Sequence, residues 1–206
     1  MKRESPYPKM TKALTGIQGF DEITDGGLPR GRTTLVMGGP GCGKTVFALQ
    51  SLVNSARLND ESGIFIAFEE STRQIVANAT TFGWDLPALA RKKLFFLDAR
   101  LSPEVVKSGE FDLIGMLSVL QAKADEMHAT RIVFDGIDVL LGLLDDPAAE
   151  RQELYRIRDW LAQTELTGII TQKTGANEAD QRGARFSSTS SGMPSSSRAR
   201  ARSCCG

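Results

Sequence analysis

Cysteine, histidine and long apolar runs are scarce in this sequence, and each scarcity excludes a class of protein. The three cysteines, Cys42, Cys204 and Cys205, form neither a disulfide framework nor a zinc-ligand spacing. The single histidine, His128, is interpreted as a solvated residue. No stretch approaches the roughly 20 apolar residues that span a bilayer, and the N-terminus lacks the apolar segment of a signal peptide. We therefore expect a cytoplasmic protein without a membrane partner.

An excess of charge of either sign is also missing. Lys and Arg total 25, and Asp and Glu total 25. No global field would therefore draw the protein toward nucleic acid, an anionic membrane or an acidic substrate. With 206 residues, of which 41% are hydrophobic, the chain is long enough for one domain with a sizeable buried core.

Short apolar runs alternate with longer amphipathic stretches from residue 33 to about residue 172, which is typical of parallel strands and crossover helices. Most of the runs are apolar throughout, as strands covered on both faces should be. The predicted fold class is α/β, with a mostly parallel sheet covered by helices on both faces. Strands are expected at 33–37, 64–68, 94–97, 131–134 and 168–171, and helices at 44–58, 72–81, 113–127 and 149–165.

The composition changes abruptly at about residue 184. Serine clusters are followed by alternating Arg and Ala and then by Cys-Cys-Gly. Nothing in this tail can build a core, so residues 184–206 are predicted to be disordered. Because an α/β domain rarely changes to such a composition after its fifth strand, we also hypothesise that the tail arises from a shifted reading frame or a gene-boundary error.

The strongest motif lies between the first expected strand and the first expected helix. Residues 38–45 read Gly-Gly-Pro-Gly-Cys-Gly-Lys-Thr and satisfy the phosphate-loop pattern G-x-x-x-x-G-K-[ST]. Glycines allow consecutive backbone N–H groups to curl around a phosphate, and the helix that follows adds its dipole. We predict that the amides from Gly39 to Thr45 bind the phosphates of ATP. Lys44 would neutralise the β- and γ-phosphates, and the Thr45 hydroxyl would be a ligand of Mg²⁺.

Acidic residues follow two of the other expected strands. A second carboxylate on the metal side should end a buried strand, and Asp135 does so, with Asp138 as the alternative. Glu69 and Glu70 follow the second strand, whose C-terminal end faces the ligand crevice of a parallel sheet. This pair is predicted to orient the water that attacks the γ-phosphate. The alternative is a solvated edge or the first turn of the next helix, where acids suit the dipole.

Further motifs resemble the KaiC family of RecA-like ATPases over about residues 12–175. They comprise the runs at 16–23, 26–36, 68–71, 82–86, 97–99, 111–113 and 151–156, in the family's order. The likeness is closest to the first ATPase domain of two-domain members. On this basis we divide the chain into an N-terminal extension (1–11), a partial KaiC-like ATPase domain (12–183) and the tail, with a RecA-like P-loop fold that is incomplete at the C-terminus.

The resemblance implies roles for particular residues and a mode of assembly. Glu69 and Glu70 match the family's paired catalytic glutamates, and Thr45 matches its magnesium-binding threonine. Thr81 falls where the family has a further hydroxyl that contacts the nucleotide. The phosphate-binding positions of the family are matched by Gly41, Cys42, Gly43 and Lys44. Family domains assemble as hexameric rings with ATP between neighbouring subunits, so a homo-hexamer is expected.

Mg-dependent ATP hydrolysis is the leading prediction, and three alternatives stay open. One is a Ser/Thr autokinase of the KaiC type, although no phosphoacceptor loop is marked in residues 1–183. Another is a RecA-like protein that binds nucleic acid under ATP control, but residues 136–146 contain no Lys or Arg, so a nucleic-acid partner is not expected. The last is a fragment without function, because the basic residues that reach a neighbour's ATP in the family are not visible after residue 183.

Overall fold

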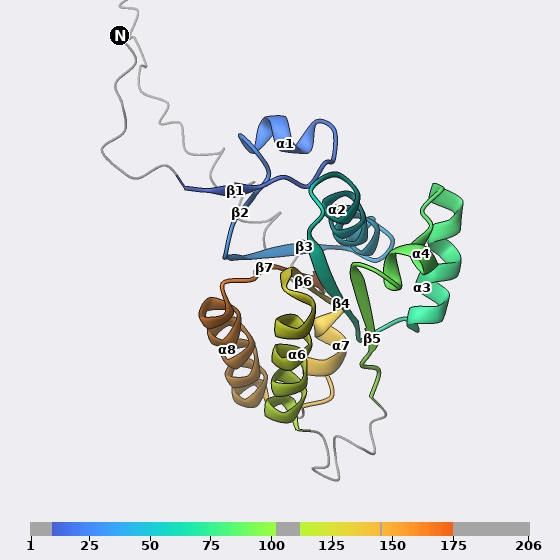
Figure 1. Cartoon of the computed structure of the whole chain (residues 1–206). Coiled ribbons are helices and arrows are strands. Elements are labelled where there is room, and N and C mark those ends of the chain that lie inside the picture. Colours follow the sequence, from blue (N-terminus) through green and yellow to red (C-terminus); the bar gives the residue numbers. More distant parts are fainter. Residues whose placement is uncertain (1–9, 102–111, 145, 175–206) are drawn as a thin grey trace, which may run out of the picture. The chain divides into compact units, whose positions relative to one another are not determined.

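A five-stranded parallel sheet forms the centre of the protein (Figure 1). The computed structural model describes residues 10–101, 112–144 and 146–174. The strand order is β3-β7-β6-β4-β5, and each neighbouring pair is parallel. The strands are β3 (Thr33–Gly38), β4 (Ser62–Ala67), β5 (Leu94–Asp98), β6 (Ala129–Asp135) and β7 (Thr167–Lys173). A small antiparallel pair, β1 (Lys12–Ala13) and β2 (Leu28–Pro29), flanks the short helix α1 (Phe20–Ile23).

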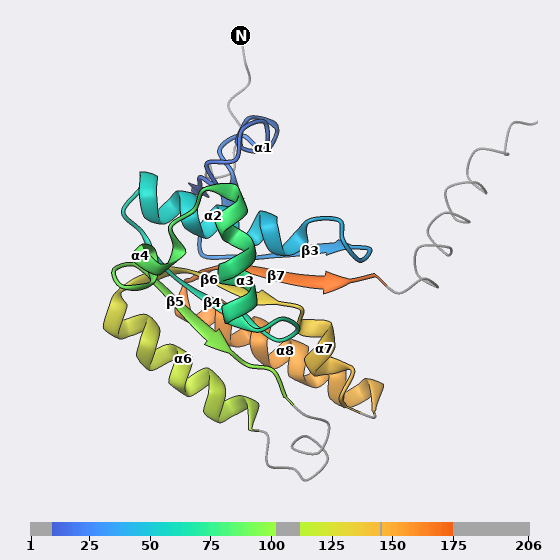
Figure 2. The same ribbon diagram turned by 90° about the vertical axis from the view of Figure 1, so that its right-hand side faces the viewer.

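Helices cover both faces of this sheet, as Figure 2 shows from the side. One face carries α2 (Lys44–Leu58), α3 (Thr72–Ala79) and α4 (Leu86–Ala90), with the 3₁₀ turn η1 (Thr80–Phe82) between the last two. The other face carries α6 (Leu113–Met127), α7 (Ile137–Leu141) and α8 (Pro147–Thr164). The predicted α/β class, with a parallel sheet between two helical layers, is therefore confirmed.

Strand β4 shows why its sequence is apolar without a break. Ile64 and Ile66 pack into the core beneath α6, whereas Phe65 packs into the core beneath α2, and all three are fully buried. Because successive side chains of a strand point to opposite faces, only a strand covered on both sides needs apolar residues at every position. Burying each such side chain contributes about 1.5–3 kcal/mol.

All nine predicted elements lie within two residues of the observed bounds, and the helices at 44–58 and 113–127 agree at both ends. The α-helix predicted at 72–81 ends two residues earlier than expected. It stops at Ala79 and tightens into η1, because Gly83 with φ +71° turns the chain away. At its other end, the Ser71 side chain accepts a hydrogen bond from the Gln74 N–H. The short elements β1, β2, α1, α4 and α7 were not predicted because they are too short to show a period.

The predicted division of the chain is only partly accessible in the structure. Residues 1–9 and 175–206 lie outside the described residues, so the N-terminal extension, the tail and the expected incompleteness of the fold after β7 are not tested. These expectations therefore stay predictions.

An ion cluster around the buried Arg131 joins four segments near the amino ends of the strands. The Arg131 side chain is 3% exposed, and its Nε lies 2.6 Å from Oε2 of Glu61. Its Nη2 also donates to the carbonyl oxygen of Leu14 at 2.7 Å. Arg30 reaches Oε1 of the same glutamate at 2.8 Å. Burial alone would raise the pKa of Glu61, but the hydrogen bonds and charges of the two arginines together lower it.

Glu61→Gln is expected to lower the free energy of unfolding at neutral pH by about 3 kcal/mol, because the buried Arg131 guanidinium loses its counter-charge. The folded-state pKa of Glu61 is lower than its unfolded value. The stabilisation that Glu61 gives to the fold is therefore complete above the ordinary pKa of 4.5. It is lost as the pH falls through the pKa of Glu61 in the folded protein. Urea unfolding should show the difference between wild type and variant at pH about 7, and a smaller one at pH about 3.5.

Glu126→Gln is the matched control for this prediction. Glu126 is paired with Lys123, but its side chain is 67% exposed, so the change should cost less than about 0.5 kcal/mol. Equal losses in the two variants would contradict a special role for the buried cluster.

Candidate nucleotide-binding site

The carboxyl ends of the parallel strands meet at one edge of the sheet and enclose a pocket of about 280 Å³. The phosphate loop follows β3, and the acidic pair Glu69 and Glu70 follows β4. Asp135 ends β6 and Lys173 ends β7. Four segments that are far apart in the sequence therefore bring polar side chains to a single pocket, as the predicted crevice at this edge requires.

The phosphate loop joins β3 directly to α2 with a backbone that favours glycine. Gly41 and Gly43 have φ values of +72° and +87°, in the left-handed region. A Cβ added at Gly41, Gly43 or Gly39 would meet no atom within 4 Å. At Gly41 and Gly43, therefore, the backbone conformation favours glycine, and not a lack of space. Gly38 differs, since a Cβ there would lie 2.5 Å from the Cys42 sulfur. The sequence thus folds into the open loop at a helix N-terminus that anions favour.

The Lys44 ammonium lies over the same loop. Its Nζ donates to the carbonyl oxygens of Gly38 at 3.0 Å and Gly39 at 2.9 Å, and it lies 3.8 Å from the Cys42 sulfur. These contacts fold the side chain back along the loop and place its charge at the pocket. The ammonium is therefore close to the backbone amides that would surround a phosphate group.

Thr45 and Asp135 touch each other beneath the loop. The Thr45 hydroxyl lies 3.0 Å from Oδ2 and 3.2 Å from Oδ1 of Asp135. The two residues are 90 positions apart in the sequence, and the sequence assigned both to the metal side. A hydroxyl and a carboxylate at this separation form a donor set that Mg²⁺ accepts when phosphate oxygens and water complete its shell.

Asp135 is 4% exposed, and its contact with Thr171 was not predicted from the sequence. Burial raises the pKa of this carboxyl, and the charges of Glu69 and Glu70 raise it further, against hydrogen bonds from Thr171 and Thr45. The Thr171 hydroxyl donates to Oδ1 of Asp135 at 2.7 Å and accepts from the Gly136 N–H at 2.8 Å. Because its single proton is directed at the carboxylate, Thr171 fixes the orientation of Asp135.

The acidic pair lines the same pocket as the loop. Both Glu69 and Glu70 are exposed, so their carboxylates remain accessible to water. Glu69 forms an ion pair with the Lys173 ammonium. Gly136 packs against Glu69, where a Cβ would come within 3.1 Å of the Glu69 Cβ. The structure thus places the pair in the pocket and not only on a solvated edge.

Two further predicted residues take other positions. Asp138, the alternative metal-side carboxylate, lies in α7 and lines the pocket, where it accepts the Lys173 backbone N–H at 3.0 Å. Asp135, and not Asp138, is the carboxylate bonded to Thr45. Thr81 lies in η1, and its exposed hydroxyl donates to the Asn78 carbonyl oxygen at 2.7 Å. It is not among the described residues that line the pocket, so its nucleotide contact stays a prediction.

The residues present fit Mg·ATP better than a metal ion held by protein alone. Within the described ranges, no group of three or more His, Cys, Asp or Glu could hold a metal. Mg²⁺ is usually bound by one or two protein ligands together with substrate phosphates, and Thr45 with Asp135 suits that mode. The loop amides and Lys44 supply the complementary cradle for the phosphates.

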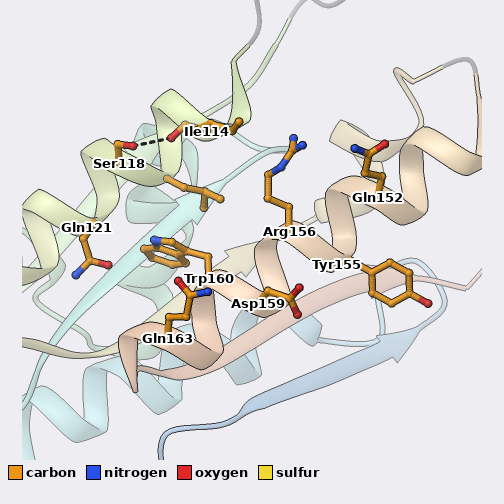
Figure 3. A pocket seen from close by; sticks show the side chains of 10 residues that line it. Ile114, Ser118, Gln121, Gln152, Tyr155, Arg156, Asp159, Trp160 and Gln163 are labelled. Atoms are coloured by element: carbon orange, nitrogen blue, oxygen red, sulfur yellow. Dashed lines mark hydrogen bonds between the residues drawn. The ribbon is translucent and has the colours of Figure 1, made fainter.

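A larger hollow of about 760 Å³ lies elsewhere, between α6 and α8 (Figure 3). Ile114, Ser118 and Gln121 line it from α6, and Tyr155, Arg156 and Trp160 are among its α8 residues. Within this groove Arg156 is hydrogen-bonded to Glu153 at 2.6 Å. The described residues that line the groove include no glycine loop. Size alone would favour this groove as a ligand site, but the groups that are predicted to bind phosphate line the smaller pocket.

Comparison with known proteins agrees with this geometry. The sequence model of the KaiC ATPase family matches residues 13–192. The chain is 39% identical over 185 residues to the circadian clock protein KaiC2 of Synechocystis sp., covering 89% of this chain and 33% of that protein. It is 43% identical over 162 residues to the circadian clock oscillator protein KaiC of Parathermosynechococcus lividus, covering 78% and 30%.

The chain therefore spans about a third of the length of these curated relatives. Among the helices of the described ranges, none combines the length and the apolar character needed to cross a membrane. The RecA-like P-loop architecture expected from the sequence is confirmed by the parallel sheet together with the family match. With most of its length matched by the family's model and by relatives at about 40% identity, this chain belongs to the KaiC family of ATPases.

Proposed function

We propose that this domain binds ATP with Mg²⁺ and hydrolyses it. The observation that carries the proposal is the contact between Thr45 and Asp135 beneath the phosphate loop, with the carboxylates of Glu69 and Glu70 in the same pocket. Phosphoryl transfer to water needs these three parts: a cradle for the phosphates, a site for the metal and a group that orients the nucleophile.

Each side chain then has one task. Lys44 and the loop amides bind the β- and γ-phosphates, and Thr45 with Asp135 would hold Mg²⁺. When bound there, the metal would neutralise charge that develops on the phosphate oxygens. Thr171 keeps the Asp135 carboxylate directed at Thr45. Glu69 or Glu70 accepts a hydrogen bond from the attacking water and receives its proton.

Assembly into a homo-hexameric ring is part of the proposal. Within the part of the chain that the structure describes, the pocket is lined by two cations, Lys44 and Lys173. The transition state of phosphoryl transfer spreads negative charge over the oxygens, and further cations from a neighbouring subunit would stabilise it. A clock-like signalling role, which the names of the relatives suggest for this chain, would depend on the same nucleotide cycle.

Thr45→Ala is expected to raise the Mg²⁺ concentration needed for half-maximal ATP binding about tenfold, because one of the two protein ligands is lost. The measurement is a Mg²⁺ titration at fixed ATP, followed by calorimetry. Thr45→Ser keeps the hydroxyl and should stay close to the wild type. Identical Mg²⁺ curves for all three proteins would contradict the proposed metal site.

Phosphate release and protein labelling separate hydrolysis from the autokinase alternative. With γ-labelled ATP, hydrolysis delivers the label to free phosphate, whereas an autokinase transfers it to Ser or Thr side chains of the protein. We expect free phosphate to contain nearly all of the label. Stable label on the protein would instead favour the autokinase.

A further inference from the structure

Lys173 is a residue of the pocket to which no motif assigns a role. It ends β7, the strand between β3 and β6, and it is paired in register with Gly38, the first glycine of the phosphate loop. Its side chain lines the same pocket as Lys44 and Asp135. A second lysine therefore approaches the nucleotide pocket from the strand that separates the phosphate loop from the metal-side carboxylate.

The backbone of Lys173 is held more firmly than its side chain. Its N–H donates to Oδ1 of Asp138 at 3.0 Å, and β7 pairs with the neighbouring strand up to this residue. The ammonium, by contrast, pairs with one acid among the described residues, Glu69, and the two side chains are 36% and 41% exposed. Exposed ion pairs contribute little free energy, so this contact can be exchanged for a stronger one at small cost.

The charges around the pocket favour such an exchange. The described lining residues include four acids, Glu69, Glu70, Asp135 and Asp138, but only two lysines. Lys44 is already held over the loop by two carbonyl oxygens. An incoming triphosphate adds negative charge beside Glu69, and of the lysines among the described lining residues Lys173 is the one that is not tied to the loop.

We propose that Lys173 detects the γ-phosphate: when ATP binds, its ammonium leaves Glu69 for the terminal phosphate, and Glu69 becomes free to orient water. The inference rests on the proposed ATPase function and deepens it, because it assigns the discrimination between ATP and ADP to one residue of the same subunit. Glu69 is engaged by Lys173 without a γ-phosphate and available with one, so the residue that would activate water is released only when there is a bond to cleave.

The size of the effect follows from the exchange. A hydrogen bond between an ammonium and a phosphate is charged on both sides, and such bonds change affinity by roughly tenfold to a hundredfold. Breaking the exposed ion pair with Glu69 reduces this gain in affinity by about fivefold at most. We therefore expect Lys173 to favour ATP over ADP by about tenfold.

Lys173→Met tests the inference in the full chain. Calorimetric titration with Mg²⁺ and a non-hydrolysable ATP analogue should show about tenfold weaker binding than in the wild type, with ADP binding unchanged. Lys173→Arg should restore most of the discrimination, because it retains the charge. Lys93→Met is the matched control: Lys93 also pairs with one acidic residue, Asp60 at 2.9 Å, but it precedes β5 at the opposite edge of the sheet.

Glu69→Gln supplies the reciprocal test. Removing this carboxylate frees Lys173 and lowers the negative charge of the pocket, so the analogue should bind several-fold more tightly. In the double variant with Lys173→Met that gain should fall to less than half, since the two residues act through one contact.

The outcomes separate the inference from the function on which it rests. If the wild type binds neither nucleotide, both are overturned. Two other outcomes overturn only the role of Lys173. In both the wild type binds ATP, and Lys173→Met either weakens the binding of ATP and ADP equally or weakens neither. Circular dichroism melting of each variant, with Lys173→Gln as a second substitution, ensures that a loss of binding is not a loss of folding.

Discussion

A protein that carries both Glu69→Gln and Glu70→Gln is expected to release phosphate from ATP about 10²–10⁴ times more slowly than the wild type, while still binding Mg·ATP. The amide keeps the size of each side chain but cannot accept a proton from water. Both carboxylates are exposed at the edge of the pocket, so their removal leaves no buried partner unpaired. The loss should therefore appear in the rate and not in the fold.

Steady-state phosphate release at saturating Mg·ATP is the measurement for this variant. The matched control is Asp125→Asn with Glu126→Gln, a second pair of adjacent acids, which lies near the C-terminal end of α6. The control should hydrolyse ATP at the wild-type rate. A double glutamate variant that retained the wild-type rate would remove the assigned catalytic role of the pair.

Lys44→Ala is expected to raise the dissociation constant of Mg·ATP about 10²–10³-fold. In the structure the ammonium donates to the carbonyl oxygens of Gly38 and Gly39, beside the loop amides that are predicted to bind phosphate. Without it, the triphosphate would face the acidic residues of the pocket with one lysine fewer. Calorimetry with Mg·ATP measures the change directly.

Lys92→Ala is the control for this second prediction, because Lys92 is exposed in the turn before β5 and outside the pocket. The affinity of the Lys92→Ala protein for Mg·ATP should equal that of the wild type. If Lys44→Ala bound Mg·ATP as tightly as this control, the phosphate loop would not be the nucleotide site.

The part of the site that the sequence predicted is the part that depends on local patterns. The loop from Gly38 to Thr45 is a contiguous motif between a strand and a helix, and its backbone follows from its glycines. Asp135 and the acidic pair end apolar strands, and parallel strands present such ends at one edge. Their assembly in one pocket could therefore be expected, although their chemical roles stay predictions.

The part that the sequence did not predict depends on strand order. Nothing local indicates that β7, last of the five strands in sequence, inserts between β3 and β6. Thr171 and Lys173 consequently received no role, although a signal existed: the apolar run of β7 ends in Thr, Gln and Lys, polar residues where a buried strand reaches the ligand edge. The choice of Asp135 over Asp138, by contrast, was made from the sequence, and the contact with Thr45 supports it.

The place of β7 between β3 and β6 has a consequence for comparing members of this family. The strand supplies the hydroxyl that orients Asp135 and the ammonium that holds Glu69, yet neither residue belongs to the phosphate-loop pattern or to the acidic pair. On the proposed roles, two domains with identical signature motifs would differ in nucleotide chemistry through a single position in this strand. A list of motifs would count both as equivalent enzymes, whereas the last residues of β7 would distinguish them.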